Sequence, residues 1–190
     1  LDVECFGGTP RVDKISWLRK MMLVNGYDKV LLSSLDEVAW MLNVRGSDIE
    51  YNPLVISYLL VSQDYVKWFV KKSPIAEDPE TPESFKELEQ EDIEVMYYDE
   101  VYRGLSDFGE DAQGGVIFID PSTLNDNVHR DICEIFGEAN IIEGVSPVIL
   151  EKSVKTESEI ENLRQTFIDD GVAMECFLHW LDEEVSTGRE

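Results

Sequence analysis

The stretch LLSSLDEVAWMLNVRGSDIEYNPLVISYLL, residues 31–60, places a helix-like segment and a polar turn between two apolar runs. The first run, residues 29–33 (KVLLS), has the length and continuity of a buried strand. Ser34 and Glu37 follow it with the spacing of a capping box, which predicts that a helix begins there. Strand, helix, turn and strand in this order predict a layered α/β unit.

The turn after the predicted helix, RGSDIEYN at 45–52, is the candidate functional segment. Gly46 is expected to let the chain turn with a positive φ. Asp48 is expected to accept backbone N–H groups of the turn, and Arg45 to bind loop carbonyls or Asp48. Pro53 then fixes the start of the next strand.

Two interpretations of this turn remain open at the level of sequence. In the first, it is a self-capped turn at the edge of a sheet. In the second, Arg45, Asp48, Tyr51 and Asn52 form a loop that completes the pocket of a neighbouring domain, because loops at strand ends often have that role in α/β folds.

The rest of the chain continues the alternation of helices and strands. Thr9 and Pro10 predict the N-cap and first position of a helix that Asn25-Gly26 ends, and Asp99 is expected to cap a short helix. The other predicted elements are strands at 55–61, 65–70, 92–98, 115–120 and 140–144, helices at 34–41, 81–90 and 125–136, and a proline-rich surface loop at 73–82. This order predicts a mixed sheet flanked by helices, with an antiparallel hairpin.

The C-terminal segment predicts one long helix. Thr156 and Glu159 have capping-box spacing. After them, one apolar face extends for about 25 residues, made of Ile160, Leu163, Phe167, Met174, Phe177 and Leu181. Such a face needs a partner to cover it, so we expect the chain to be part of a longer protein.

Composition disfavours several classes of partner and indicates the cellular setting. Sixteen basic against 40 acidic residues give a net charge of -24, which disfavours nucleic acid and anionic membrane as partners. No apolar run has the length of a membrane span. Cys5, Cys133 and Cys176 are far apart, which predicts reduced thiols in a cytoplasmic setting.

The search for catalytic motifs is negative. The two histidines, His129 and His179, are each predicted to lie singly on a helix surface, so no cation site of the chain's own is expected. No Gly-x-Ser-x-Gly motif is present, and the glycine doublets at 7–8 and 114–115 lack the spacing of a phosphate-binding loop.

At this point residues 31–60 are similar to the signature of the middle domain of three-domain Xaa-Pro aminopeptidases (aminopeptidase P), in the creatinase/prolidase "pita-bread" superfamily. The C-terminal part resembles the join into that family's catalytic domain. The residues that carry this second match are Lys152, Lys155, Glu159, Ile160, Glu161, Arg164, Phe177, Trp180 and Leu181. Thr166-Phe167 departs from the Ala-His pair of many members, so no role is transferred to these two positions. The resemblance covers residues 9–186.

The resemblance implies a creatinase-N-like fold and a division of the chain into three parts: a linker at 1–8, a middle domain at 9–150 and the start of the catalytic domain at 151–190. The family removes an N-terminal residue that precedes proline, using two divalent metal ions, usually manganese. Its ligands, two Asp, one His and two Glu, lie downstream of the first catalytic helix. The resemblance therefore implies no catalytic or metal-binding residue in these 190 residues.

The resemblance also implies two partners: the catalytic domain of the same chain and a peptide with proline at its second position. Without that catalytic domain, the C-terminal helix is expected to fold back on the middle domain, to pair with a second copy of the chain as a homodimer, or to swap. One alternative is a pseudo-peptidase module that binds peptides or proteins. The other, a two-domain dipeptidase or creatinase, is disfavoured because those chains lack the stretch at 45–53. Whether the protein beyond Glu190 carries the five metal ligands distinguishes the first alternative from an active enzyme.

Overall fold

The computed structural model describes residues 8–71, 88, 91–110 and 115–187, with side chains omitted at 108–110. These residues fall into two compact units, one formed by Thr9–Ser153 and the other containing Val154–Glu190. The predicted linker at 1–8 (apart from Gly8), the loop at 73–82, most of the helix at 81–90 and Cys5 lie outside the described residues.

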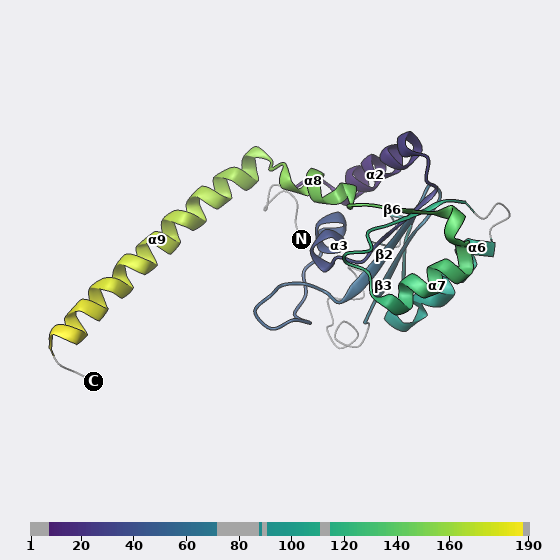
Figure 1. Cartoon of the computed structure of the whole chain (residues 1–190). Helices are drawn as coiled ribbons and strands as arrows, with labels where there is room; N and C mark the ends of the chain where they lie inside the picture. The colour runs from purple at the N-terminus through teal and green to yellow at the C-terminus, as the bar shows by residue number, and fades with distance from the viewer. Residues whose placement is uncertain (1–7, 72–87, 89–90, 111–114, 188–190) are drawn as a thin grey trace. The chain divides into compact units, whose positions relative to one another are not determined.

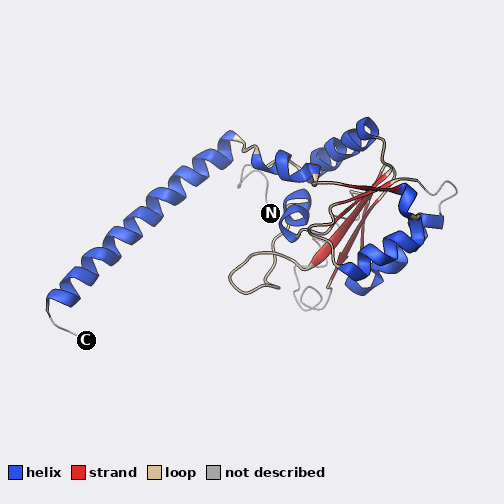
Figure 2. Cartoon of the chain, viewed as in Figure 1, coloured by secondary structure: helices blue, strands red, loops and turns tan. Residues whose placement is uncertain are grey.

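A mixed sheet of six strands forms the centre of the first unit in its described part (Figure 2). The strands are β1 (Lys29–Leu32), β2 (Ser57–Ser62), β3 (Val66–Val70), β4 (Ile93–Tyr97), β5 (Ile117–Ile119) and β6 (Ile141–Glu143), in the order β4-β3-β2-β1-β5-β6. β2 is antiparallel to β1 and β3, while the β3–β4, β1–β5 and β5–β6 pairs are parallel. The predicted mixed sheet and its β2–β3 hairpin are confirmed.

Helices cover both faces of this sheet (Figure 1). α2, α3 and α8 pack on one face, and α6 and α7 on the other. Their bounds are α2 Arg11–Asn25, α3 Leu35–Leu42, α6 Val101–Glu110, α7 Asp126–Phe136 and α8 Pro147–Ser153, with the 3-10 turns η1 Tyr98–Glu100 and η2 Glu138–Asn140. α8 had not been predicted from the sequence.

Burial on both faces explains the continuous apolar runs. In β1, Val30 and Leu32 belong to the core beneath α2 and α3, while Leu31 belongs to the core beneath α6 and α7. β2 divides in the same way, with Leu59 on the first side and Leu60 on the second. Because alternate side chains enter opposite cores, neither strand has a polar face.

The predicted end of α2 is confirmed, because Gly26 ends this helix with φ 76°. Asn125, predicted as the first residue of the helix at 125–136, is instead the N-cap of α7 and accepts a hydrogen bond from the Val128 N–H. The other predictions were wrong in three places: Pro10, not Thr9, is the N-cap of α2; Asp99 lies inside η1; and Ser34 makes no side-chain cap bond to α3. The Ser34 hydroxyl instead donates to Asp36 Oδ1, and the buried Glu37 side chain binds Ser146, so neither side-chain bond of the predicted capping box forms.

The second unit contains α9 (Glu157–Ser186), 30 residues long, so the predicted long helix is confirmed. Its capping box is also confirmed: Thr156 Oγ1 accepts from the Glu159 N–H, and Glu159 Oε2 accepts from the Thr156 N–H. A single helix cannot bury its own apolar stripe, so α9 needs a second surface to cover it. No helix among the described residues combines the length and apolarity that crossing a membrane requires.

Candidate functional site

The strand directions place many of the connecting loops at one end of the sheet, where the carboxyl ends of most strands lie. We call this end the carboxyl edge. β1, β3, β4, β5 and β6 all end at this edge, and β2, antiparallel to β1 and β3, begins there. In open α/β sheets, ligands bind beyond the carboxyl ends of the strands. The turn at 45–52 precedes β2 and therefore belongs to this edge.

Two cations hold the start of the turn against the C-terminal end of α3. Arg45 Nη1 donates to the carbonyl oxygens of Ala39 (3.3 Å) and Val44 (2.8 Å). From α2, the buried Lys14 Nζ donates to the Trp40 carbonyl at 2.5 Å and lies 4.2 Å from the centre of the Trp40 ring. The Ala39 and Trp40 carbonyls also accept the Val44 and Asn43 N–H groups, so the two side chains reinforce the C-terminal end of α3, where positive charge is favourable. Of its two predicted partners, Arg45 binds the carbonyls.

Asp48 closes the turn from its other side. Its Oδ2 accepts a 2.9 Å hydrogen bond from the Ile56 N–H, as predicted. Gly46, however, does not adopt a positive φ, so that prediction was wrong. A Cβ at Gly46 would lie 2.5 Å from Val55 Cγ2, so glycine is needed there for close packing instead.

Tyr51 and Asn52 form the exposed tip of the turn. Asn52 pairs with Ile49 in an isolated antiparallel bridge, which leaves Tyr51 at the bend with φ 62°. The Tyr51 side chain is 97% exposed. A bulky residue with positive φ is strained, and such strain often marks a functional position. Arg45 and Asp48 thus bind the backbone of the turn, while Tyr51 and Asn52 are presented to solvent.

A buried polar network lies at the same edge. Glu37 of α3 is 2% exposed, and its Oε2 accepts a 2.6 Å hydrogen bond from Ser146 Oγ, at the start of α8. The Ser146 N–H in turn donates to Asp120 Oδ2, directly after β5, at 2.9 Å. Lys152 of α8 also forms an ion pair with Asp36 of α3. These contacts join α3, β5 and α8 near the candidate loop.

The two carboxyl groups of this network are shifted in opposite directions. Burial raises the pKa of Glu37, and the Ser146 hydrogen bond offsets only part of that effect. Burial also acts to raise the pKa of Asp120, but hydrogen bonds from Ser122 and Ser146 outweigh it, so the pKa lies below its ordinary value. The network therefore makes Glu37 harder to ionise than an ordinary glutamate and Asp120 easier to ionise than an ordinary aspartate.

A tyrosine pair occupies the other face of the same edge. The rings of Tyr58 and Tyr98 stack with centroids 5.2 Å apart, and their hydroxyl oxygens are 3.3 Å apart. Asn125 Nδ2 donates to Tyr58 Oη while its own side-chain oxygen caps α7. Burial, and then the Tyr98 hydrogen bond, raise the pKa of Tyr58, so its phenol stays protonated. These contacts lock helix α7 onto the sheet and offer no reactive base.

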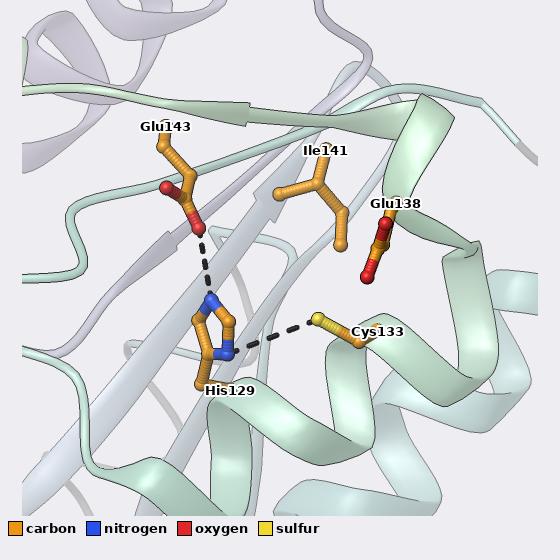
Figure 3. Close-up of a pocket in the computed structure, with 5 residues that line it drawn as sticks. All are labelled: His129, Cys133, Glu138, Ile141 and Glu143. Carbon is orange, nitrogen blue, oxygen red and sulfur yellow. Dashed lines mark hydrogen bonds and ion pairs between the residues drawn. The ribbon is translucent and has the colours of Figure 1, made fainter.

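A pocket that was not predicted from the sequence lies beside the edge strand β6 (Figure 3). His129, predicted to lie singly on a helix surface, instead bonds Glu143 Oε1 through Nε2 at 2.9 Å. Its Nδ1 lies 3.8 Å from Cys133 Sγ, one turn along α7. The His129–Cys133 spacing of four was visible in the sequence, but the contribution of Glu143 requires the fold.

The described residues do not fit the two-metal centre that the family resemblance implies. Within residues 8–71, 88, 91–110 and 115–187, no group of three or more His, Cys, Asp or Glu side chains is arranged to hold a metal ion. His179, on α9, contacts Glu183 of the same helix at 3.5 Å. We therefore derive no catalytic step through a metal in this chain.

Comparison with known families decides the classification. The model of the creatinase/prolidase N-terminal domain matches residues 2–159. The chain belongs to the creatinase/prolidase N-terminal domain family. Its six-stranded mixed sheet with helices on both faces is the creatinase-N-like fold predicted from the resemblance.

The relatives with similar sequences are longer proteins, and the chain matches only a part of each. The chain is 33% identical to Xaa-Pro aminopeptidase 1 of Dictyostelium discoideum over 95% of its length, and 29% identical to Aminopeptidase P2 of Arabidopsis thaliana over 95%. It spans 27% and 28% of those relatives. The matching creatinase/prolidase domain is thus roughly a quarter of each relative.

Two solved structures have folds similar to that of this chain. The crystal structure of X-prolyl aminopeptidase from Caenorhabditis elegans, described as a cytosolic enzyme with a di-nuclear active site, matches with a TM-score of 0.84 at 30% identity. The match covers 99% of this chain and 29% of that one. An X-Pro aminopeptidase from Thermotoga maritima matches with a TM-score of 0.54 at 20% identity, over 77% of this chain and 38% of that one, which supports the fold alone.

Proposed function

We propose that the chain is the non-catalytic middle domain of a metal-dependent Xaa-Pro aminopeptidase, which removes the N-terminal residue of peptides with proline at the second position. The observation that carries this proposal is the match to the C. elegans enzyme over 99% of this chain and only 29% of that one. Because the described residues offer no three-ligand metal group, we place the two divalent ions, expected to be manganese, in the rest of the parent protein.

In this proposal, residues 9–150 form the middle domain and residues 151–190 begin the catalytic domain, with 1–8 as a linker. The apolar stripe of α9 then packs either against the rest of the catalytic domain or against a second copy of the chain. At ~25 cal/mol per Å² of apolar surface, leaving such a stripe in water would cost several kcal/mol. The C. elegans relative is described as cytosolic, and we propose a cytoplasmic location for the parent.

We assign Arg45, Asp48, Tyr51 and Asn52 to a loop that shapes substrate access in the parent. Arg45 and Asp48 fix the backbone of the loop through its own carbonyl and N–H groups. Tyr51 is then held at the tip, 97% exposed and with positive φ, which no contact inside the loop requires of a tyrosine. An exposed aromatic side chain on a loop whose backbone is held in place suits contact with a surface outside this domain.

Activity of the isolated chain tests the assignment of catalysis. The 190-residue chain is incubated with Mn²⁺ and a tripeptide that has proline at its second position, with the full-length parent as positive control. We expect turnover by the parent and none by the chain. Metal-dependent release of the first residue by the chain alone would contradict the proposal, as would a full-length parent that remains inactive with added Mn²⁺.

A pair of substitutions in the full-length parent tests the loop. Tyr51→Gly removes the aromatic side chain and relieves the positive φ, so stability should remain within about 1 kcal/mol of the wild type. We expect kcat/KM to fall at least several-fold. Glu50→Ala, at an exposed neighbouring position, is the control and should change neither. If Y51G leaves kcat/KM unchanged, the loop is only a self-capped turn.

A further inference from the structure

The side of strand β6 that faces away from β5 carries no partner strand in the described part of the chain. β6 is the last strand of the sheet, and β5 pairs with it from the other side. The Gly144 N–H, directly after β6, donates to the Ile119 carbonyl of β5. Because successive residues of a strand direct their main-chain groups alternately to its two sides, Ile141 and Glu143 direct theirs away from β5. We call this side the open side of β6.

Three main-chain groups are available on the open side of β6. The Ile141 N–H already donates to the Glu138 carbonyl at the end of η2. The Ile141 carbonyl, and the N–H and carbonyl of Glu143, have no hydrogen-bond partner among the described residues. Such groups pair readily with an extended peptide, which adds a strand to the sheet. β6 has only three residues, so side chains must contribute to the binding as well.

A pocket adjoins β6 on the face of the sheet that α7 covers. It has a volume of about 360 Å³ and is lined by His129, Cys133, Glu138, Ile141 and Glu143. Figure 3 shows the side chains of Ile141 and Glu143 pointing from β6 toward α7. A strand added to β6 places every second side chain on this same face. One of those side chains would therefore enter the pocket, which has no part in the function proposed above.

The lining of the pocket suits a long basic side chain. Glu138 and Glu143 supply two carboxylates, and none of the five lining residues is a lysine or arginine. The apolar stem of a lysine or arginine can pack on Ile141 while its cation binds a carboxylate. His129 Nε2 bonds Glu143 Oε1 at 2.9 Å and so orients this carboxylate, whose other oxygen retains lone pairs for the cation.

Charge distinguishes a basic segment from a second copy of this chain. Two copies paired through β6 would bring two sets of Glu138 and Glu143 together, and like charges across an antiparallel strand pair are destabilising. Each copy also has a net charge of -24, which repels another copy and attracts a cationic peptide. The charges therefore favour a basic partner.

We propose that β6 and its pocket bind an extended, basic segment of a partner protein by strand addition. The main chain of the segment bonds Ile141 and Glu143, and one lysine or arginine side chain enters the pocket and pairs with Glu138 or Glu143. The inference concerns the open side of β6 and does not depend on whether the parent is an aminopeptidase.

Peptide titration provides the first test. The probe is a short fluorescent peptide of alternating threonine and lysine with blocked ends, and the readouts are anisotropy and the amide NMR spectrum of the chain. We expect saturable binding, with shifts at residues 141–144 and in α7, and no binding of the peptide with glutamate in place of lysine. Shifts confined to β4, at the opposite side of the sheet, or no binding at all would overturn the proposal.

Backbone methylation of the probe tests strand addition without changing the protein. One peptide carries N-methyl groups on its threonines and another on its lysines, so only one of the two loses the N–H groups that face β6. We expect that peptide to bind at least about ten-fold more weakly than the other. Equal binding of the two would show that the attraction is only electrostatic and would contradict strand addition.

Variants of the chain separate the carboxylates from the main chain. Glu138→Gln and Glu143→Gln should each weaken binding several-fold, while Glu151→Gln, an exposed position on α8, should not change it. Glu143→Pro also removes the outward N–H and should bind at least about ten-fold more weakly than E143Q. Circular dichroism checks that each variant is folded. Equal binding by E138Q, E143Q and E151Q, equal binding by folded E143P and E143Q, or self-association of the peptide-free chain through β6 in sedimentation and NMR would contradict the proposal.

Discussion

Ser146 Oγ donates a 2.6 Å hydrogen bond to Glu37 Oε2, joining two buried residues that are 109 positions apart in the sequence. The same hydroxyl accepts from the Val148 N–H at 3.3 Å and so caps α8. One serine thus starts a helix and satisfies a carboxyl group in the core. This link fixes α8 against α3.

The pH dependence of stability should reveal Glu37. Its pKa is raised above 4.5 in the folded chain, so the folded state keeps this proton to a higher pH than the unfolded state. Stability from this group is therefore full below about pH 4 and lost as the pH rises through the folded pKa. Glu37→Gln removes the effect, and we expect a relative gain on the order of 1 kcal/mol at pH 7–8 that vanishes at pH 4. Urea unfolding across pH measures it.

Asp120→Asn is the matched control with the opposite slope. The pKa of Asp120 is lowered below 3.8, so its contribution is present above that value and lost as the pH falls through the folded pKa. D120N should therefore be the less stable variant at neutral pH and approach the wild type in acid. If the stabilities of E37Q and D120N relative to the wild type change with pH in the same direction, the opposite pKa shifts of the two carboxyl groups are incorrect.

Ser146→Ala should lower the free energy of unfolding by about 1–3 kcal/mol, because the change removes both the partner of Glu37 and the cap of α8. Thermal unfolding at pH 7 measures this loss. Ser153→Ala, an exposed position at the end of the same helix, should be nearly neutral. Equal stability of S146A and S153A would show that the buried bond contributes nothing.

Two helical glycines should respond in opposite ways to alanine. In α6, a Cβ at Gly104 would lie 2.3 Å from Cζ of the buried Phe69, so G104A should destabilise the fold by about 1–3 kcal/mol. In α9, Gly171 has no heavy atom within 4 Å of that position, so G171A should increase local helix stability by up to about 1 kcal/mol. Urea unfolding tests the first and amide hydrogen exchange the second. A neutral G104A would contradict the close packing of α6 on β3.

Asp48→Ala should destabilise the turn, because it leaves the Ile56 N–H without its carboxylate acceptor. The expected loss is about 1–2 kcal/mol in the free energy of unfolding. Glu50→Ala again serves as the control within the same turn. Thermal stability that is equal in D48A and E50A would mean that the contact does not hold the turn.

Two predicted capping boxes show when a local sequence pattern is sufficient to predict a contact. Thr156 and Glu159 form theirs as predicted, because both reciprocal bonds lie within one turn of α9. Ser34 and Glu37 have the same spacing but do not, because Glu37 is buried and bonded to Ser146. The capping-box spacing therefore does not predict the contact when a residue distant in the sequence, here Ser146, binds the Glu37 carboxyl group in the core.

The contacts of the candidate sites also divide into those between sequence neighbours, which could be predicted, and those between distant residues, which could not. The apolar runs of β1 and β2, the end of α2 at Gly26 and the binding of a nearby backbone N–H group by Asp48 could be predicted, because each depends on neighbours in sequence. The spacing of His129 and Cys133 is likewise local. Their meeting with Glu143 is not.

The sequence by itself determined the strands, most helices and the acidic charge, since these follow from periodicity and composition, and it indicated the family through the resemblance of residues 31–60 and of the C-terminal part. Tertiary structure decided which polar groups meet: Glu37 with Ser146, Lys14 with the end of α3, and His129 with Glu143. The physical reason is that a helix or strand is specified by contacts a few residues apart. A hydrogen bond between residues far apart in the sequence depends instead on the order of the strands, which long-range packing selects.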